Sequence, residues 1–156
     1  MADISVAFQR VCETFKIVDL NPFQREAIEY FVKKKLDVFV NLPTGYGKSL
    51  IYQALPLVFD VTRNSTGHVV VVISPLVNLM KDQVESLQKL GIPAVSLSDI
   101  ADREARALEE GRYRVVYGTP EAWLNNERWR KMLSSDIYTS KLCAIAVDEA
   151  HIIKQW

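Results

Sequence analysis

The sequence has little of what marks a metal-bound, secreted or membrane-spanning protein. Its 156 residues include only two cysteines and two histidines, and these lack the spacing of a zinc site. Cys12 and Cys143 both lie in apolar stretches, which favours buried, reduced thiols. No apolar run approaches the length of a membrane span, and the N-terminus has neither the basic nor the apolar segment of a signal peptide. We therefore expect an intracellular protein that is not secreted and does not enter a membrane.

Net charge is also absent, because 19 lysines and arginines balance 19 aspartates and glutamates. A nucleic-acid partner would therefore have to be held by a local surface, not by the overall charge of the protein. Hydrophobic residues make up 49% of the chain and charged residues 24%, which is typical of a soluble globular protein. A chain of this length predicts one ordinary domain that buries about 70% of the surface exposed by its unfolded form.

The hydrophobic pattern predicts two opening helices followed by alternating strands and helices. Apolar residues at helical spacing between Ile4 and Phe15 predict the first helix, and the second begins at Asn21 and Pro22. This alternation predicts an α/β fold, a largely parallel sheet with ligand loops at the carboxyl ends of its strands. The continuous β-branched run 69–73 predicts a strand covered on both faces. The other predicted strands are 37–41, 94–97, 113–117 and 142–147, and the later helices are 50–59, 76–90, 101–110 and 120–133, the last in one piece or two.

A candidate phosphate loop, residues 42–49 with the sequence LPTGYGKS, follows an apolar run and opens a helix. Glycines let the backbone approach a polyphosphate, and a helix N-terminus directs free N–H groups at the anion. Lys48 would reach the β- and γ-phosphates, and Ser49 would hold Mg²⁺. The general motif has a glycine where Leu42 stands, so a glycine-rich turn that only caps the helix is the alternative. The other residues expected at the phosphates are Thr44, Gly45, Tyr46 and Gly47.

A second candidate segment is the apolar run 142–147, which leads directly into Asp148 and Glu149. Such a strand would place both carboxylates beside the phosphate loop. Asp148 would bind Mg²⁺ through water, and Glu149 would orient or deprotonate the attacking water. The alternative is a helix start at which Asp148 is the N-cap. Together the two segments indicate a site for ATP and Mg²⁺.

Several segments resemble, in the right order, the motifs of the RecQ-like branch of superfamily-2 DNA helicases, and this resemblance covers nearly the whole chain from Glu13 onward. It also accounts for Leu42, because these helicases replace the first glycine of the general phosphate-loop motif. The residues that resemble motif Ia are the most specific single match. The segments are 42–53 (LPTGYGKSLIYQ, motif I), 73–84 (ISPLVNLMKDQV, motif Ia), 117–121 (YGTPE, motif Ib) and 148–151 (DEAH, motif II), followed by Gln155 and Trp156 at the start of an aromatic-rich loop.

The resemblance implies a P-loop NTPase with a RecA-like sheet, helices on both faces, and a preceding helical segment. It implies that Gln24 reads the adenine edge; alternatively, Gln24 closes a capping box with Asn21. Family members tend to stack adenine between an aromatic residue and an arginine, whose places here are taken by Ile17 and Asn21. For His151 the resemblance implies a catalytic link between the ATP state and the nucleic-acid side, and the alternative is a polar residue at a helix start.

Motifs Ia and Ib imply contacts to single-stranded or forked DNA, made mainly to the sugar-phosphate backbone. Lys81 is expected to add charge there, or else to be a solvated helix residue. The residues expected at the nucleic acid are Ser74, Pro75, Asn78, Lys81, Thr119, Glu121 and, in the aromatic-rich loop, Trp156. The remaining tryptophans, Trp123 and Trp129, are expected to be packing residues.

The resemblance further implies that residues 1–156 are part of a first RecA-like helicase domain. Residues 1–35 would form the N-terminal helices with the adenine motif, and 36–156 the P-loop core as far as motif II. We expect the ATP-binding part of a 3′-to-5′ DNA helicase of DNA repair and recombination, located in the nucleus or in a prokaryotic cytoplasm or nucleoid. Because a second RecA-like domain supplies the arginine finger, we expect weak nucleotide binding and neither useful hydrolysis nor unwinding by this chain alone. The alternatives are a non-catalytic nucleotide- or nucleic-acid-binding remnant and a fragment of a DEAH-type RNA helicase.

Overall fold

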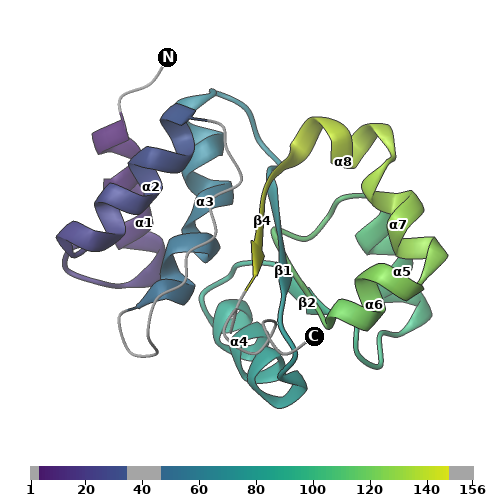
Figure 1. The fold of residues 1–156 in the computed structure, drawn as a ribbon. Helices are drawn as coiled ribbons and strands as arrows, with labels where there is room; N and C mark the ends of the chain where they lie inside the picture. The colour runs from purple at the N-terminus through teal and green to yellow at the C-terminus, as the bar shows by residue number, and fades with distance from the viewer. Residues whose placement is uncertain (1–3, 35–46, 148–156) are drawn as a thin grey trace.

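The computed structural model describes residues 4–34 and 47–147. The two predicted opening helices are present as α1 (Ile4–Phe15) and α2 (Pro22–Lys34). Both pack beside α3 (Lys48–Thr62), as Figure 1 shows. The predicted strand 37–41 lies outside the described residues.

The sheet has four described strands in the order β2-β3-β1-β4, and every neighbouring pair is parallel. This confirms the predicted parallel α/β sheet. At its carboxyl edge Ile73 is level with both Gly118 and Val147, so three strands end side by side. The strands are β1 (Val69–Ile73), β2 (Ala94–Ser96), β3 (Val115–Gly118) and β4 (Leu142–Val147).

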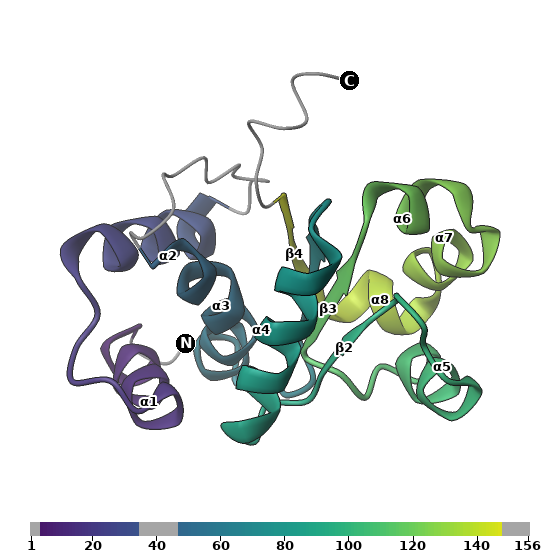
Figure 2. The ribbon, with the colours of Figure 1, turned by 90° about the horizontal axis from the view of Figure 1, so that it is seen from below.

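Helices cover both faces of the sheet, as Figures 1 and 2 show. One face packs against α1, α2, α3 and α4 (Val77–Lys89). The other packs against four shorter helices, of which α6 and α7 are the predicted helix 120–133 in two pieces. These helices are α5 (Asp102–Glu109), α6 (Pro120–Asn125), α7 (Glu127–Leu133) and α8 (Asp136–Lys141). None of the helices described within 4–34 and 47–147 is long and apolar enough to cross a membrane.

The central strand β1 separates two hydrophobic cores. Val70 and Val72 face the core under α1, α3 and α4, while Val69 and Val71 face the core under α5 to α8. All four valines are buried, which confirms the prediction of a strand covered on both faces. Full burial of a valine side chain stabilises a fold by about 1.5–3 kcal/mol relative to exposure, so β1 is the strand on which both layers depend.

Two elements differ from the sequence-based expectation. α3 continues three residues past the predicted end at residue 59, despite Pro56 in its interior, because Thr62 is buried and donates its hydroxyl to Val58 O at 2.9 Å. The short helix α8 was not predicted. Its single buried residue is Tyr138, and one buried position leaves no helical periodicity in the sequence.

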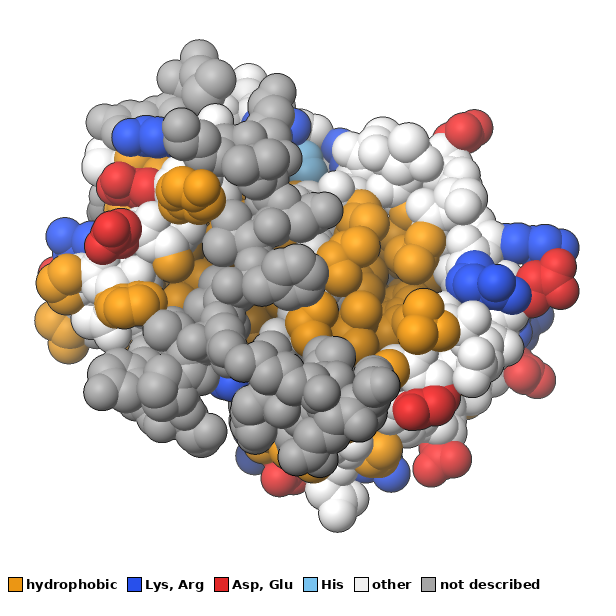
Figure 3. Space-filling model, in the orientation of Figure 1, with side chains coloured by type: hydrophobic (Ala, Val, Ile, Leu, Met, Phe, Trp, Pro, Cys, Tyr) orange, Lys and Arg blue, Asp and Glu red, His pale blue; other side chains and the backbone are white. Residues whose placement is uncertain are grey.

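The prediction that β4 is a buried strand was wrong in part, because only Ala144 is fully buried. The physical reason is that β1 is the one described strand with which β4 pairs. Leu142 and Ile145 pack against the second core yet stay partly accessible. Figure 3 shows hydrophobic side chains gathered between β4 and the helices α7 and α8.

Candidate functional site

The helix α3 runs antiparallel to the strands and begins at their carboxyl edge. Near its start, Gln53 contacts Tyr117, which lies toward the end of β3. Near its other end, Asp60 Oδ1 accepts the N–H of His68, the residue that precedes β1, at 3.0 Å. Ligand loops of parallel α/β sheets lie at this edge, so α3 begins where a ligand is expected.

Gly47 gives the start of α3 an unusual backbone. Its φ of 68° and ψ of 29° are left-handed, and as a glycine it has no side chain of its own with which to cap the helix that follows. The first N–H groups of a helix have no partner within the helix, and the helix dipole adds partial positive charge there. The arrangement suits an anion such as a phosphate group.

Gln24 connects α2 to this loop. It is 6% exposed, and its Nε2 donates to Gly47 O at 3.2 Å. Its Oε1 accepts the Asn21 N–H at 3.0 Å, and Asn21 Oδ1 accepts the Gln24 N–H at 2.8 Å. These reciprocal bonds confirm the predicted capping box. Because a primary amide has two N–H donors and an oxygen with two lone pairs, the capping role and the predicted adenine contact are chemically compatible.

Gly47 also has a steric reason to be glycine. A Cβ atom built on it would lie 2.5 Å from Gln24 Nε2. Any other side chain would therefore push Gln24 away from the loop, in addition to the strain of a positive φ. The sequence alone placed Gly47 and Gln24 in one candidate site but gave no sign that they touch.

The residues described at the start of α3 have side chains suited to binding a nucleotide phosphate. Lys48 and Ser49 are the first two residues of α3, and both are half-buried. A cation and a hydroxyl at the start of a helix are the donor types that polyphosphate and Mg²⁺ require. Thr44, Gly45, Tyr46, Asp148, Glu149, His151 and Trp156 lie outside the described residues.

The predicted magnesium ligand Asp148 directly follows Val147, which pairs with Ile73 at the carboxyl edge. The chain therefore leaves β4 at the edge where α3 begins. Within the described ranges, no group of three or more histidine, cysteine, aspartate or glutamate side chains could hold a metal ion.

A hydrogen bond joins the loop that follows β1 to the end of β3, from which the second candidate nucleic-acid segment begins. The N–H of Ser74, after β1, donates to the carbonyl of Gly118, at the end of β3, at 3.0 Å. Ser74 is 1% exposed, and its Oγ accepts the Leu76 N–H at 3.3 Å. The structure thus places Ser74 inside the loop that it supports.

The other candidate nucleic-acid residues lie nearer the surface. Asn78 is exposed and Pro75 half-buried around the start of α4. Thr119 is the N-cap of α6, and its Oγ1 accepts the Ala122 N–H at 3.2 Å. Glu121, in the first turn of α6, is exposed.

Lys81 is exposed and its Nζ lies 3.6 Å from Asp99 Oδ2. The two side chains are 51% and 91% exposed, so this ion pair contributes little to stability. The ammonium group is close to solvent, where an approaching phosphate could replace Asp99.

Both tryptophans that were predicted to be packing residues are buried, Trp123 at 3% and Trp129 at 4% exposure. Trp123 Nε1 donates to Val72 O at 3.3 Å and so fastens α6 to β1. A Cβ on Gly118 would lie 2.5 Å from that nitrogen, which explains the glycine that ends β3.

Two side-chain hydrogen bonds that the sequence did not predict leave the second turn of α3. The Tyr52 hydroxyl donates to Gln83 Oε1, and Gln53 Nε2 donates to the Tyr117 hydroxyl oxygen, both at 2.8 Å. The partners are 31 and 64 residues apart in the sequence. The sequence contains no signal that pairs them.

Comparison with known proteins agrees with the motif order. The profile of the family described as DEAD/DEAH box helicase matches residues 21–156. The ATP-dependent helicase SGS1 of Saccharomyces cerevisiae is 40% identical over 152 residues, which is 94% of this chain and 10% of that protein. The ATP-dependent DNA helicase RecQ of Bacillus subtilis is 36% identical over 138 residues, 85% of this chain and 21% of that protein.

A third relative is the bifunctional 3′-5′ exonuclease/ATP-dependent helicase WRN of Mus musculus, 38% identical over 136 residues. The match covers 86% of this chain and 9% of that protein. The chain thus spans between 9% and 21% of the lengths of these three relatives. This chain belongs to the DEAD/DEAH box helicase family, and its relatives are helicases of the RecQ type.

Proposed function

We propose that this chain is the nucleotide-binding part of an ATP-dependent DNA helicase of RecQ type that acts inside the cell. The observation that carries the proposal is the left-handed Gly47 at the start of α3, whose carbonyl is held by Gln24 at the carboxyl edge of a parallel sheet. Family membership supports the use of ATP with Mg²⁺. The name of one of these relatives, the ATP-dependent DNA helicase RecQ of Bacillus subtilis, describes a helicase of DNA, which supports DNA over RNA as the nucleic acid.

In this proposal the phosphates of ATP lie against the loop Thr44 to Gly47 and the start of α3. Lys48 contacts the β- and γ-phosphates, and Ser49 with Asp148 holds Mg²⁺. Glu149 orients the attacking water, and His151 links the nucleotide to the nucleic-acid side. Gln24 reads the adenine edge while it caps α2.

Single-stranded or forked DNA lies, in the same proposal, across the starts of α4 and α6. Asn78 and Thr119 present polar groups there, and Lys81 presents a cation. These groups suit phosphate and sugar contacts, which position a strand without reading its sequence. Pro75 and Glu121 flank the strand, Ser74 holds the loop beneath it, and Trp156 extends the contact.

Unwinding belongs to the proposal for the whole protein, because the chain spans at most about a fifth of the relatives named above. In helicases of this superfamily a second RecA-like domain supplies an arginine finger to the transition state. We propose that the 156-residue chain by itself binds nucleotide and does not turn it over at a useful rate.

The experiment that tests this proposal measures binding of Mg²⁺ and a fluorescent ATP analogue to Lys48→Ala. Loss of a charge-assisted contact to phosphate predicts at least about tenfold weaker binding, equivalent to about 1.4 kcal/mol. Lys89→Ala is the matched control, since Lys89 is exposed in the last turn of α4, away from the start of α3. Equal affinities of the wild-type chain and Lys48→Ala would remove the basis of the proposal.

A further inference from the structure

Two consecutive residues of α3 bind two different neighbouring elements through their side chains. Tyr52 reaches Gln83 on α4, and Gln53 reaches Tyr117 on β3, in both cases at 2.8 Å. One bond joins α3 to α4, which carries Asn78 and Lys81, and the other joins it to β3, which leads into Thr119. These four residues are called the α3 bridge below.

The two tyrosines of the α3 bridge are buried, whereas Gln53 and Gln83 are partly exposed. Tyr117 is fully buried and Tyr52 is 6% exposed. Their rings meet edge to face, with centroids 6.3 Å apart and planes 73° apart. A hydrogen bond in such surroundings is directional, and leaving one of its partners unpaired is costly. A displacement of α3 would therefore strain both hydrogen bonds and would tend to move Gln83 and Tyr117 with it.

The ends of the α3 bridge are close to both candidate sites. Tyr52 lies four residues after Lys48, one helical turn from the proposed phosphates. Gln83 is on the same helix as Asn78 and Lys81, and Tyr117 is two residues before Thr119. The bond from Ser74 N–H to Gly118 O connects the two nucleic-acid loops in addition.

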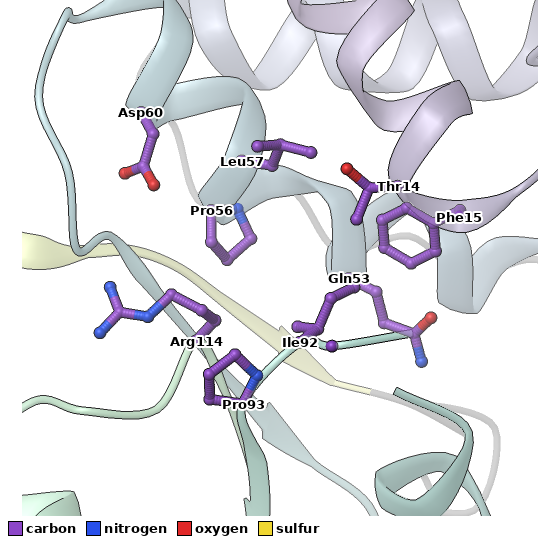
Figure 4. A pocket seen from close by; sticks show the side chains of 10 residues that line it. Thr14, Phe15, Gln53, Pro56, Leu57, Asp60, Ile92, Pro93 and Arg114 are labelled. Atoms are coloured by element: carbon purple, nitrogen blue, oxygen red, sulfur yellow. The ribbon is translucent and has the colours of Figure 1, made fainter. Parts of the chain in front are cut away.

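Gln53 has space to change its arrangement. It lines a cavity of about 150 Å³ between the end of α1, α3 and the start of β2. Figure 4 shows Gln53 at one end of this cavity, with Arg114 and Asp60 at the other. A cavity of this size has room for an amide group or for water. This space would accommodate a second arrangement of the Gln53 side chain, and coupling between sites requires an element with two discrete arrangements.

We propose that Tyr52, Gln53, Gln83 and Tyr117 are positioning residues that couple nucleotide binding at the start of α3 to the nucleic-acid segments at the starts of α4 and α6. This inference rests on the proposed function, because it assumes that nucleotide binds at Lys48. Nucleotide binding draws the first turn of α3 toward the phosphates, and the α3 bridge transmits that movement to α4 and β3. Coupling of this kind is reciprocal, so nucleic acid bound at α4 and α6 changes nucleotide affinity by the same factor.

The test is hydrogen–deuterium exchange of the 156-residue chain, with and without Mg²⁺ and a non-hydrolysable ATP analogue. Three regions are followed: the start of α3 (residues 48–53), the helix α4 (residues 77–89), and the segment from β3 to α6 (residues 115–125). In the wild-type chain nucleotide slows exchange in all three, and the change in the second and third is at least about fivefold, the lower end of typical coupling.

The decisive variant combines Tyr52→Phe with Tyr117→Phe, which removes both hydroxyl groups and keeps both rings. We expect nucleotide to slow exchange at residues 48–53 as before, and to have no effect on residues 77–89 or 115–125. Tyr138→Phe is the matched control: Tyr138 is also fully buried and donates its hydroxyl to Leu108 O, but it lies in the other core. Each variant is compared with itself without nucleotide, so a uniform loss of stability cancels.

The outcomes separate the two proposals. If nucleotide changes no region of the wild-type chain, the proposed function fails and the coupling with it. If nucleotide changes only residues 48–53, or if the double variant keeps the change in α4 and β3–α6, the proposed function stands and the coupling is refuted. Loss of the distant change in Tyr138→Phe as well would show a general effect of buried hydroxyl groups and would also refute it.

Discussion

Gly47 and Gly91 have similar backbones and different surroundings. Both have positive φ values, 68° and 81°. A Cβ on Gly47 would meet Gln24, whereas a Cβ on Gly91 would meet nothing within 4 Å. Substituting alanine at Gly91 measures the cost of a positive φ alone, whereas substituting it at Gly47 adds the cost of displacing Gln24.

We expect Gly91→Ala to lower the free energy of unfolding by about 1 kcal/mol, the lower end of the cost of a left-handed non-glycine residue. Gly47→Ala should cost about 0.5–1.5 kcal/mol more, because the amide nitrogen of Gln24 must shift and lose its bond to Gly47 O. Urea unfolding of both variants measures the difference. Equal losses would show that the contact between Gln24 and Gly47 contributes nothing.

Cys143 gives the stability of the chain a dependence on alkaline pH. The residue is partly exposed, but desolvation by the surrounding protein raises the pKa of its thiol to about 12, so the folded protein keeps the neutral form. Below the ordinary thiol pKa of 9.0 both states are protonated and this contribution is fully present. As the pH rises from 9 toward 12 the unfolded chain loses its proton first, and stability falls.

The measurement is the urea midpoint between pH 8 and pH 11 for the wild-type chain and Cys143→Ala. We expect the midpoint of the wild type to fall more steeply above pH 9. Burial also raises the pKa of Tyr138, in the same direction, but that contribution is common to both proteins. Parallel curves would contradict a thiol that stays neutral at Cys143 in the folded protein.

Among the elements, α6 depends on a close approach to the end of β3. Trp123 donates its indole N–H to Val72 O, and Gly118 leaves the space for the ring. We expect Gly118→Ala to lower the free energy of unfolding by about 1–3 kcal/mol through overpacking.

A double-mutant cycle with Trp123→Phe identifies the cause of this loss. The smaller ring makes room for the added methyl group, so Gly118→Ala should cost less in the Trp123→Phe background. Additive losses would mean that the methyl group clashes chiefly with Leu97, the other close neighbour, at 2.9 Å.

Elements with a strong hydrophobic period could be predicted from the sequence. The apolar face of α1, the cap and proline at the start of α2, and the valine run of β1 all led to the correct element type. The helix α8 could not be predicted, because Tyr138 alone anchors it. The burial of β4 was overestimated because an apolar strand has the same sequence pattern whether it lies in the middle of a sheet or at its end.

The candidate-site residues that could be proposed from the sequence are those that lie close together in it. Gly47, Lys48 and Ser49 are adjacent, and the capping box of Asn21 and Gln24 has a fixed spacing. The bond from Gln24 to Gly47 and the α3 bridge depend on how helices and strands pack. A single sequence carries no signal for such contacts.

Over the whole molecule, the amino ends and the carboxyl ends of the strands differ in the contacts around them. At the amino ends of the strands, Arg114 Nη1 donates to His68 O at 3.2 Å, and Lys141 Nζ donates to Ser65 Oγ at 2.7 Å. His68 Nδ1 also lies 2.6 Å from Asp60 Oδ1. This edge is fastened by side chains, whereas the carboxyl edge carries the proposed ligand loops.

A nucleotide site at the start of α3 is tested most directly by amide NMR of the ¹⁵N-labelled chain, titrated with Mg²⁺ and an ATP analogue and then with a short oligothymidine. We expect nucleotide to shift the signals of Gly47, Lys48 and Ser49, and the oligonucleotide to shift those of Asn78 and Thr119. Signals of the amino edge, around His68 and Arg114, should stay in place. No nucleotide shift at Gly47, Lys48 or Ser49, or larger shifts at the amino edge than there, would contradict a nucleotide site at the start of α3.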